Sequence, residues 1–299
     1  MKLVKQFNQR TLLPIRSREQ WPRTVCSDVS LRRVCVLDVE TTGLESDRDD
    51  VIEVCAAMTL VDRDGRIVGI QSIGNALQSP GRPLSREISE ITGLTDDDLV
   101  GQHIERERLT AFVERCDSVI AFNAQFDRPF IERLLPRLQV RPWACAMREI
   151  PWRALGFEPG PQNYLLMQAG YYSPAAHRAR DDVLSLVQLL DHVCRDGESV
   201  IAKLLLAMDT PTFRFEASTA GYDRRHDLRR QGYRWASAAS HQLWHKVVPA
   251  KAFRAEYRWY LQTIGKRPVV VRLPASERHR DETAWRPSPK QVEIVPWRR

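Results

Sequence analysis

The sequence has 299 residues and 43% hydrophobic composition, which predicts two domains or one large domain with attachments and excludes wholesale disorder. There is no apolar run of 18 residues, no signal-peptide core and only six scattered cysteines, so we expect a cytoplasmic protein without a membrane partner. The net charge of +7 is segregated, with +4 over 1–30, −8 over 31–198 and +11 over 199–299. This pattern suggests a carboxylate-rich core between basic segments that could hold a polyanion, although basic ends can also simply aid solubility.

The period of the apolar residues predicts the elements of the first two thirds of the chain. Strands are predicted at 34–40, 51–61, 66–77 and 118–122. Helices are predicted around 109–116, from Pro129 to 138 and over 179–195. A tight-turn sequence ending at Gly65 joins the second and third strands into a hairpin. The order indicates an α/β fold with a mixed sheet, one antiparallel excursion and helices on its faces.

Beyond Gly197 tryptophan and arginine become frequent, which marks a change of domain. We expect a basic N-terminal extension at 1–30, an acidic domain at 31–198, a linker at 199–211, a small Trp/Arg-rich α+β module at 212–265 and a basic tail at 266–299. The module should contain a strand at 212–215 and a helix at 250–263. In the tail, a strand at 268–273 should precede a mobile Pro/Arg-rich end.

Four carboxylates are predicted to converge at one end of the sheet. Asp38 and Glu40 are two apart on a buried strand, so both point to the same face. Asp127 lies at a strand-to-helix junction, and Asp182 lies on the flank of the apolar stripe of the last core helix, whereas Asp181 points away from it. Because buried carboxylates need compensation by hard cations, the pattern favours two Mg²⁺ or Mn²⁺ ions.

His177 lies five residues before Asp182 in a polar loop, where a neutral imidazole could take a proton from a metal-bound water. Taken singly, these residues have structural alternatives: a strand-end turn for Asp38, a helix cap for Asp127 and a surface position for His177. Their occurrence together favours phosphoryl transfer to water.

Three segments carry a family resemblance: VLDVETTGL (36–44), FNAQFDRPF (122–130) and HRARDD (177–182). They resemble the three motifs of the DEDDh (DnaQ-like) 3′–5′ exonucleases, the group that includes the proofreading subunit of bacterial DNA polymerase III. The resemblance covers about residues 31–197 and implies an RNase H-like fold with a five-stranded mixed sheet. It also implies two Mg²⁺ or Mn²⁺ ions, with Asp38, Glu40, Asp127 and Asp182 as their ligands. It further implies that His177 is the general base.

The resemblance also implies contacts to the substrate. Candidates for holding the terminal nucleotide are Thr41, Thr42, Gly43, Leu44, Asn123 and Phe126. Arg180 could touch a phosphate or be a solvated loop residue. Thr92 and Phe122 stand where many members of the family have histidine, which affects substrate detail rather than metal binding.

In the C-terminal third, arginines are interleaved with aromatic residues, as in DLRRQGYRW (227–235), a pattern that suits single-stranded nucleic acid. The alternative is that Trp235, Trp244 and Trp259 form the core of a small domain. His241 and His245 could bind zinc on a helix, but no third ligand is in view.

These observations predict a metal-dependent 3′–5′ exonuclease that hydrolyses terminal phosphodiesters of single-stranded DNA to nucleoside monophosphates, in a role such as DNA repair. The expected partners are the 3′ end of a single-stranded nucleic acid and a possible polymerase. Alternatives are a 3′–5′ exoribonuclease and a nucleic-acid-binding or polymerase-associated protein.

Overall fold

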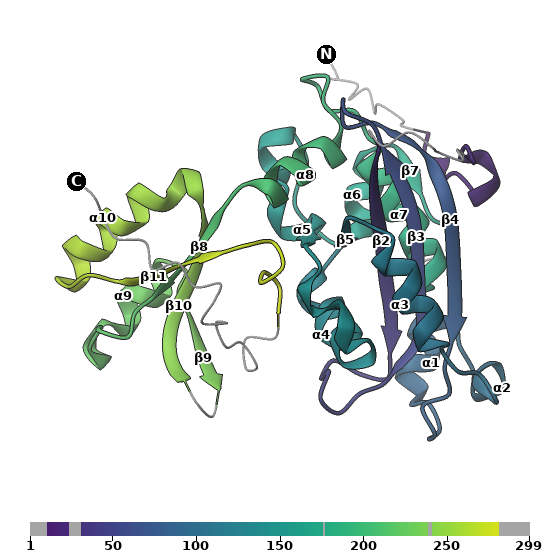
Figure 1. Ribbon diagram of the computed structural model, residues 1–299, viewed down its shortest axis with the longest axis horizontal. Helices are drawn as coiled ribbons and strands as arrows, with labels where there is room; N and C mark the ends of the chain where they lie inside the picture. Colours follow the sequence, from purple (N-terminus) through teal and green to yellow (C-terminus); the bar gives the residue numbers. More distant parts are fainter. Residues whose placement is uncertain (1–10, 24–30, 176, 239–240, 281–299) are drawn as a thin grey trace, which may run out of the picture.

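The computed structural model describes residues 11–23, 31–175, 177–238 and 241–280, which form two lobes (Figure 1). We call residues up to Thr210 the larger lobe and residues 212–273 the C-terminal module. Residues 274–280, the return segment, pass back to the larger lobe. No helix of the described residues combines the length and apolar character needed to span a membrane.

A mixed five-stranded sheet forms the centre of the larger lobe, in the order β4-β3-β2-β5-β6. Its strands are β2 (Arg32–Thr41), β3 (Val51–Val61), β4 (Ile67–Leu77), β5 (Ser118–Ala121) and β6 (Trp143–Cys145). The pairs β2–β3 and β3–β4 are antiparallel, whereas β5 and β6 run parallel to β2. The predicted mixed five-stranded sheet is confirmed, and β6 is a strand that the sequence did not reveal.

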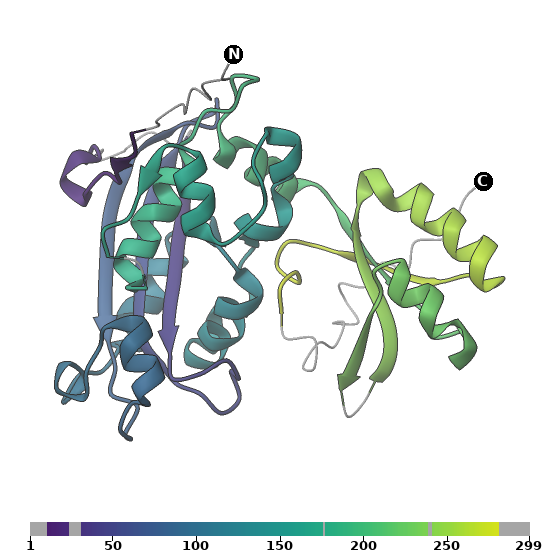
Figure 2. The same cartoon turned by 180° about the vertical axis from the view of Figure 1, so that it is seen from behind.

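Helices cover both faces of this sheet. They are α1 (Arg86–Thr92), α2 (Asp96–Leu99), α3 (Arg106–Glu114), α4 (Ala124–Leu134), α5 (Ala146–Glu149), α6 (Gln162–Gln168), α7 (Ala179–Leu190) and α8 (Val200–Asp209). Short elements complete the lobe: η1 (Arg18–Gln20), η2 (Pro136–Val140), η3 (Trp152–Leu155), and the paired strands β1 (Leu13–Pro14) and β7 (Tyr171–Tyr172). In Figure 2 the α6 and α7 helices lie in front of the sheet, whereas α3 lies in front of it in Figure 1.

The alternation of side chains along β2 divides the core into two layers. Val34 and Val36 pack with α6, α7 and α8, whereas Cys35 and Leu37 pack with residues of α3 and α4 on the opposite face. Every even-numbered residue of β2 therefore faces the α7 layer.

Two predicted helices have different bounds. α4 begins at Ala124, so Pro129 lies inside the helix rather than in its first turn. α7 ends at Leu190, not at 195, because the following residues turn back: Val193 bridges to Ser199, and the Val200 N–H donates to the His192 carbonyl.

The segment predicted as a linker, 199–211, is largely a core helix. Ser199 caps α8 by accepting the Ala202 N–H, and the apolar residues of α8 join the core beside α7. Gly65 in the β3–β4 turn, with φ of +73°, packs against Ala202, where a Cβ would come within 2.4 Å of the Ala202 Cβ. The α8 helix is thus part of the core of the larger lobe.

The C-terminal module is a four-stranded antiparallel sheet in the order β11-β8-β10-β9 with helices on one face. Its elements are β8 (Thr212–Glu216), η4 (Tyr222–Arg224), α9 (Arg225–Arg230), β9 (Arg234–Ala238), β10 (His241–Pro249), η5 (Ala250–Ala252), α10 (Phe253–Ile264) and β11 (Val269–Leu273). The strand predicted in the tail therefore completes the module, which extends past residue 265. His241 and His245 lie on a strand rather than on the helix that the zinc alternative required.

The aromatic residues of the module form its core beneath α10. Phe215 and Tyr260 are buried there, and Trp244 and Trp259 pack against the same cluster. Trp235 is 47% exposed and contacts Trp244 edge to face. Trp244 and Trp259 thus belong to the core of the module, as the structural alternative predicted, rather than to a surface for stacking bases.

The return segment is fixed to the larger lobe by buried arginines. The Arg128 side chain is fully buried, donates to the carbonyls of Gln139, Ser276 and Arg278, and pairs with Glu132 at 2.7 Å. Since Arg128 follows Asp127 in α4, the return segment packs against the same helix that carries a predicted metal ligand.

Candidate active site

The first two carboxylates of the site come from β2. Asp38 and Glu40 continue the even-numbered series of Val34 and Val36, so both point to the α7 face. They lie beyond the last β2–β5 pair, Val36 with Ile120, at the end of the sheet where the parallel strands terminate. This placement leaves their side chains between the sheet and the first turn of α7.

Asp182 completes a three-carboxylate cluster. It lies in the first turn of α7, and its carboxylate oxygens, with those of Asp38 and Glu40, lie within 4.8 Å of one another. The three side chains are half-buried and offer only oxygen atoms. Such a donor set fits hard divalent cations such as Mg²⁺ or Mn²⁺.

Asp127 lies beside this cluster and is held there by a backbone contact. Its Oδ1 accepts the Val39 N–H at 3.3 Å, and the side chain is buried. Because β5 ends at Ala121, Val39 has no strand partner on that edge, and the carboxylate takes the place of one. The Asp127 carboxylate is therefore bound to the backbone of Val39, which lies between Asp38 and Glu40.

The pKa values of the four carboxyls are all raised, first because burial disfavours the charged form. The pKa of Asp38 is raised well above its usual range, with further contributions from the neighbouring carboxylates Asp127, Asp182 and Glu40. The pKa is raised to about 8 for Glu40, about 7 for Asp127 and about 6 for Asp182. Four such groups ionise together only when a cation compensates them, which is the electrostatic condition of a metal site.

His177 reaches the cluster through its backbone. Its N–H donates to Asp182 Oδ2 at 3.0 Å, and its φ of 66° lies in the left-handed region. A non-glycine residue in that region is unusual and is held by its surroundings. The side chain is exposed, so the imidazole is free to meet solvent or substrate next to Asp182.

Glu53 is a buried carboxylate of the site that the sequence reasoning missed. It lies opposite Glu40 in the β2–β3 register and is fully buried. Arg178 Nε lies 3.0 Å from Glu53 Oε2, Asn75 donates to Oε1 at 2.8 Å, and the Ala179 N–H donates at 3.3 Å. The sequence contains one sign of it, since Glu53 is a charged residue within the largely apolar run 51–61.

The contacts of Glu53 connect the sheet to the start of α7. Arg178 is the residue after His177, and Ala179 is the first residue of α7. The ion pair therefore fixes the loop that carries His177 and the helix turn that carries Asp182. We regard Glu53 and Arg178 as positioning residues, because their contacts act on the orientation of the cluster rather than on a reacting atom.

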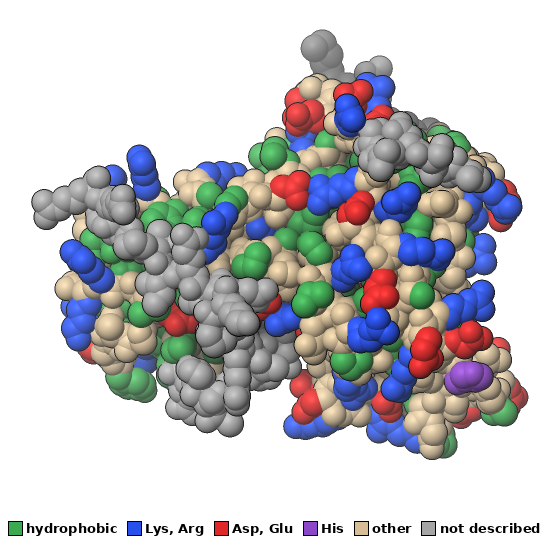
Figure 3. Space-filling model, in the orientation of Figure 1, with side chains coloured by type: hydrophobic (Ala, Val, Ile, Leu, Met, Phe, Trp, Pro, Cys, Tyr) green, Lys and Arg blue, Asp and Glu red, His purple; other side chains and the backbone are tan. Residues whose placement is uncertain are grey.

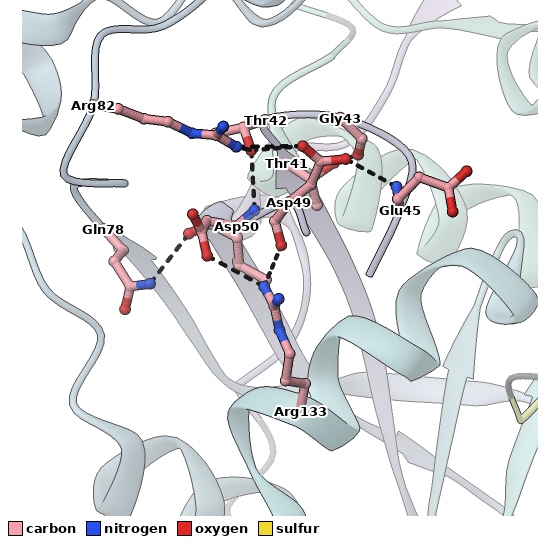
Figure 4. A network of polar contacts seen from close by, with 10 residues as sticks. Thr41, Thr42, Gly43, Glu45, Asp49, Asp50, Gln78, Arg82 and Arg133 are labelled. Atoms are coloured by element: carbon pink, nitrogen blue, oxygen red, sulfur yellow. Dashed lines mark hydrogen bonds and ion pairs between the residues drawn. The ribbon is translucent and has the colours of Figure 1, made fainter. Parts of the chain in front are cut away.

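The loop after β2 is held by the polar network drawn in Figure 4. Thr42 Oγ1 accepts the Asp50 N–H at 3.0 Å and an Arg82 N–H at 3.0 Å. Asp49 accepts the Glu45 N–H at 3.0 Å and pairs with Arg82 at 3.4 Å. These contacts give the predicted substrate loop a defined conformation.

Arg133 anchors this loop from α4, by donating to the Asp49 carbonyl and by pairing with Asp50 at 3.3 Å. Gly43 lies directly against Asp49, and a Cβ at that position would come within 2.4 Å of the Asp49 carboxylate. Leu44 is 80% exposed at the tip, and the Thr41 hydroxyl donates to the Gly43 carbonyl at 2.6 Å. The exposed Leu44, four residues after Glu40, is available for an apolar contact with a bound molecule.

The remaining sequence candidates have different surroundings. Asn123 precedes α4, and its buried Oδ1 has no hydrogen-bond partner among the described residues. The Phe126 ring packs 5.2 Å from that of Phe130, within the core layer on the α4 side. Phe122 packs against the core, and Thr92 donates to the Ile88 carbonyl at the end of α1. Asn123 thus has a free acceptor among the described residues, whereas the Phe126 ring is partly buried against the core.

Comparisons with known proteins show similarity to exonucleases and to DNA polymerase III proteins. A family model described as Exonuclease (RNase T) matches residues 35–190. The DNA polymerase III subunit epsilon of Treponema pallidum is 31% identical over 160 residues, which cover 51% of this chain and 72% of that protein. The PolC-type DNA polymerase III of Thermotoga petrophila is 34% identical over 110 residues, which cover 36% of this chain but only 8% of that protein.

Among solved structures, Escherichia coli exonuclease I in complex with a dT13 oligonucleotide is similar, with a TM-score of 0.47 and 14% identity. The similarity covers 61% of this chain and 48% of that chain.

Proposed function

Because this chain belongs to the exonuclease family, we propose that it is a metal-dependent 3′–5′ exonuclease acting on single-stranded DNA. It hydrolyses the terminal phosphodiester and releases nucleoside monophosphates. The observation that carries the proposal is the convergence of Asp38, Glu40 and Asp182, with Asp127 held beside them on the Val39 N–H.

In this function Asp38, Glu40, Asp127 and Asp182 hold two Mg²⁺ or Mn²⁺ ions. When bound, the ions supply activation of the attacking water and stabilisation of the leaving oxygen. His177, exposed beside Asp182, accepts the proton of that water. The loop of Thr41, Thr42, Gly43 and Leu44 holds the terminal nucleotide, and Asn123 Oδ1 offers it a hydrogen-bond acceptor.

The test is digestion of 5′-labelled single-stranded DNA and RNA with Mg²⁺ or Mn²⁺, for the wild type and for Asp38→Ala/Glu40→Ala. We expect a ladder that shortens from the 3′ end, is lost in the double variant and is faster on DNA. Asp62→Ala/Asp64→Ala is a matched control, because the β3–β4 turn lies at the opposite end of the sheet. Cleavage that persists without Asp38 and Glu40 would refute the assignment, and faster loss of RNA would make the protein an exoribonuclease.

A polymerase partner is a second proposal, favoured by the relatives named as DNA polymerase III proteins. Such a role fits a cytoplasmic location, and the five described cysteines are free thiols in the core. Co-purification of the intact chain with a replicative polymerase would support the partnership, and separate elution of the two purified proteins would refute it.

A further inference from the structure

A cavity of about 930 Å³ lies between the larger lobe and the C-terminal module. On the larger lobe its walls come from α5 and α8, and on the module they come from β8, β9 and β10. The two walls belong to parts of the chain that fold around separate cores, so the cavity exists only where the lobes face each other.

The module wall is the open face of its sheet. Phe213 and Phe215 of β8 pack under α10, so the alternate residues Thr212 and Arg214 point to the opposite face and line the cavity. Val247 pairs with Arg214 in the register and lies on the same face. The helices of the module therefore cover one side of this sheet, and the other side is turned toward the larger lobe.

The charges on the walls are mainly positive. Eight lining residues are basic and three are acidic: Arg148, Lys203, Arg214, Arg234, Lys246, Lys251, Arg278 and Arg280 against Glu149, Glu198 and Glu277. Five of the basic residues form ion pairs, namely Lys203, Arg214, Lys246, Arg278 and Arg280. Among the described residues the exposed side chains of Arg148, Arg234 and Lys251 have no acidic partner. Both walls thus present cations that an anionic ligand could neutralise.

Apolar side chains are interspersed among these cations. Leu206 of α8 is 67% exposed and Val247 of β10 is 48% exposed, one on each wall. A ligand that combines regularly spaced negative charges with flat apolar faces would use both kinds of group. Single-stranded nucleic acid has this chemistry, since its phosphates meet cations and its bases meet apolar surface.

The cavity extends to the helix that carries a site carboxylate. Gln125, in the first turn of α4, lines it, and Asp127 lies in the same turn. On the visible face of the larger lobe in Figure 3, acidic and basic side chains are intermingled. The net charge is −8 over 31–198 and +11 over 199–299, so a polyanion approaching Asp127 is attracted most strongly from the side of the module.

We propose that this cavity holds the stretch of single-stranded nucleic acid that lies 5′ of the terminal nucleotide in the active site. The inference rests on the proposed exonuclease function and extends it to the path of the strand. The cations of both walls bind phosphates of that stretch, so the cavity contributes to the binding of long strands and not of the shortest ones.

The test compares Arg148→Gln/Arg234→Gln, one cation from each wall, with the matched control Arg63→Gln/Arg66→Gln in the β3–β4 turn. Binding of a fluorescent dT20 is measured in EDTA over a range of salt concentrations, so that no hydrolysis is required. We expect the cavity variant to lose affinity on the order of tenfold and the slope of log K against log salt to fall by about 1.4, because two phosphate contacts are lost at about 0.7 each. The control should match the wild type.

Hydrolysis of the trinucleotide dT3 with Mg²⁺ separates the cavity from the active site, and the cavity variant should cleave it at the wild-type rate. Unchanged dT20 affinity and salt slope would overturn the proposal, as would an equal loss of dT3 hydrolysis and dT20 binding. A wild type that binds dT20 but cleaves neither substrate would refute the exonuclease function instead.

Discussion

Replacement of Glu40 by glutamine should stabilise the metal-free protein at alkaline pH. Burial and the charges of Asp182, Glu53 and Asp127 raise the Glu40 pKa from 4.5 to about 8. The folded state therefore binds the Glu40 proton more tightly than the unfolded chain does. The contribution of this proton to the free energy of unfolding is complete below pH 4.5 and is lost as the pH rises through 8. At 1.36 kcal/mol per pH unit, the loss of unfolding free energy is about 5 kcal/mol, and glutamine, which cannot ionise, avoids it.

Urea unfolding in EDTA, followed by circular dichroism at pH 5 and pH 8.5, measures this effect. The wild type should lose unfolding free energy between the two pH values, and Glu40→Gln should lose less. Glu87→Gln is the control, because Glu87 is an exposed residue of α1 and its replacement leaves the cluster intact. Addition of Mn²⁺ at pH 8.5 should stabilise the wild type more than Glu40→Gln. The reasoning fails if Glu40→Gln is the less stable protein at pH 8.5, or if it keeps the pH dependence of the wild type.

Three further substitutions test separate parts of the site. Asp38→Ala should nearly abolish hydrolysis in the ladder assay while keeping a folded circular dichroism spectrum, since it removes a ligand and relieves charge repulsion; an active variant would contradict the site. Arg178→Met should lower the free energy of unfolding by roughly 2 to 3 kcal/mol in urea titrations, because Glu53 keeps a buried charge, and should also reduce kcat. Gly43→Ala should raise KM for single-stranded DNA more than it lowers kcat, because the new Cβ displaces Asp49 in the substrate loop; equal changes would place the loop in the chemical step.

The elements predicted best are those whose burial follows a simple period. β3 and its hairpin turn match the sequence prediction, and Asp38 and Glu40 share a face because alternation along a strand is a local property. The placement of Asp182 rather than Asp181 in the cluster likewise follows from the turn of one helix. Local geometry was therefore sufficient for most of the carboxylate cluster.

The features that the sequence did not reveal depend on contacts between distant segments. Glu53 pairs with Arg178, 125 positions later, and Arg128 donates to carbonyls of the return segment, 148 and 150 positions later. Pro129 suggested a helix start because proline favours a first turn, but α4 begins at Ala124 and tolerates the interior proline. Tertiary contacts override local preference at each of these positions.

The two crossings between the lobes have a mechanical consequence. The chain leaves after α8 and comes back through the return segment, and the buried Arg278 joins the crossings by donating to the carbonyls of Ala207 and Thr210 while it pairs with Glu149. The two crossing segments are thus held side by side, which restrains twisting and sliding of the module relative to the larger lobe. A break in the polypeptide inside the module would therefore leave the return segment bound to the larger lobe through the contacts of Arg128 and Arg278.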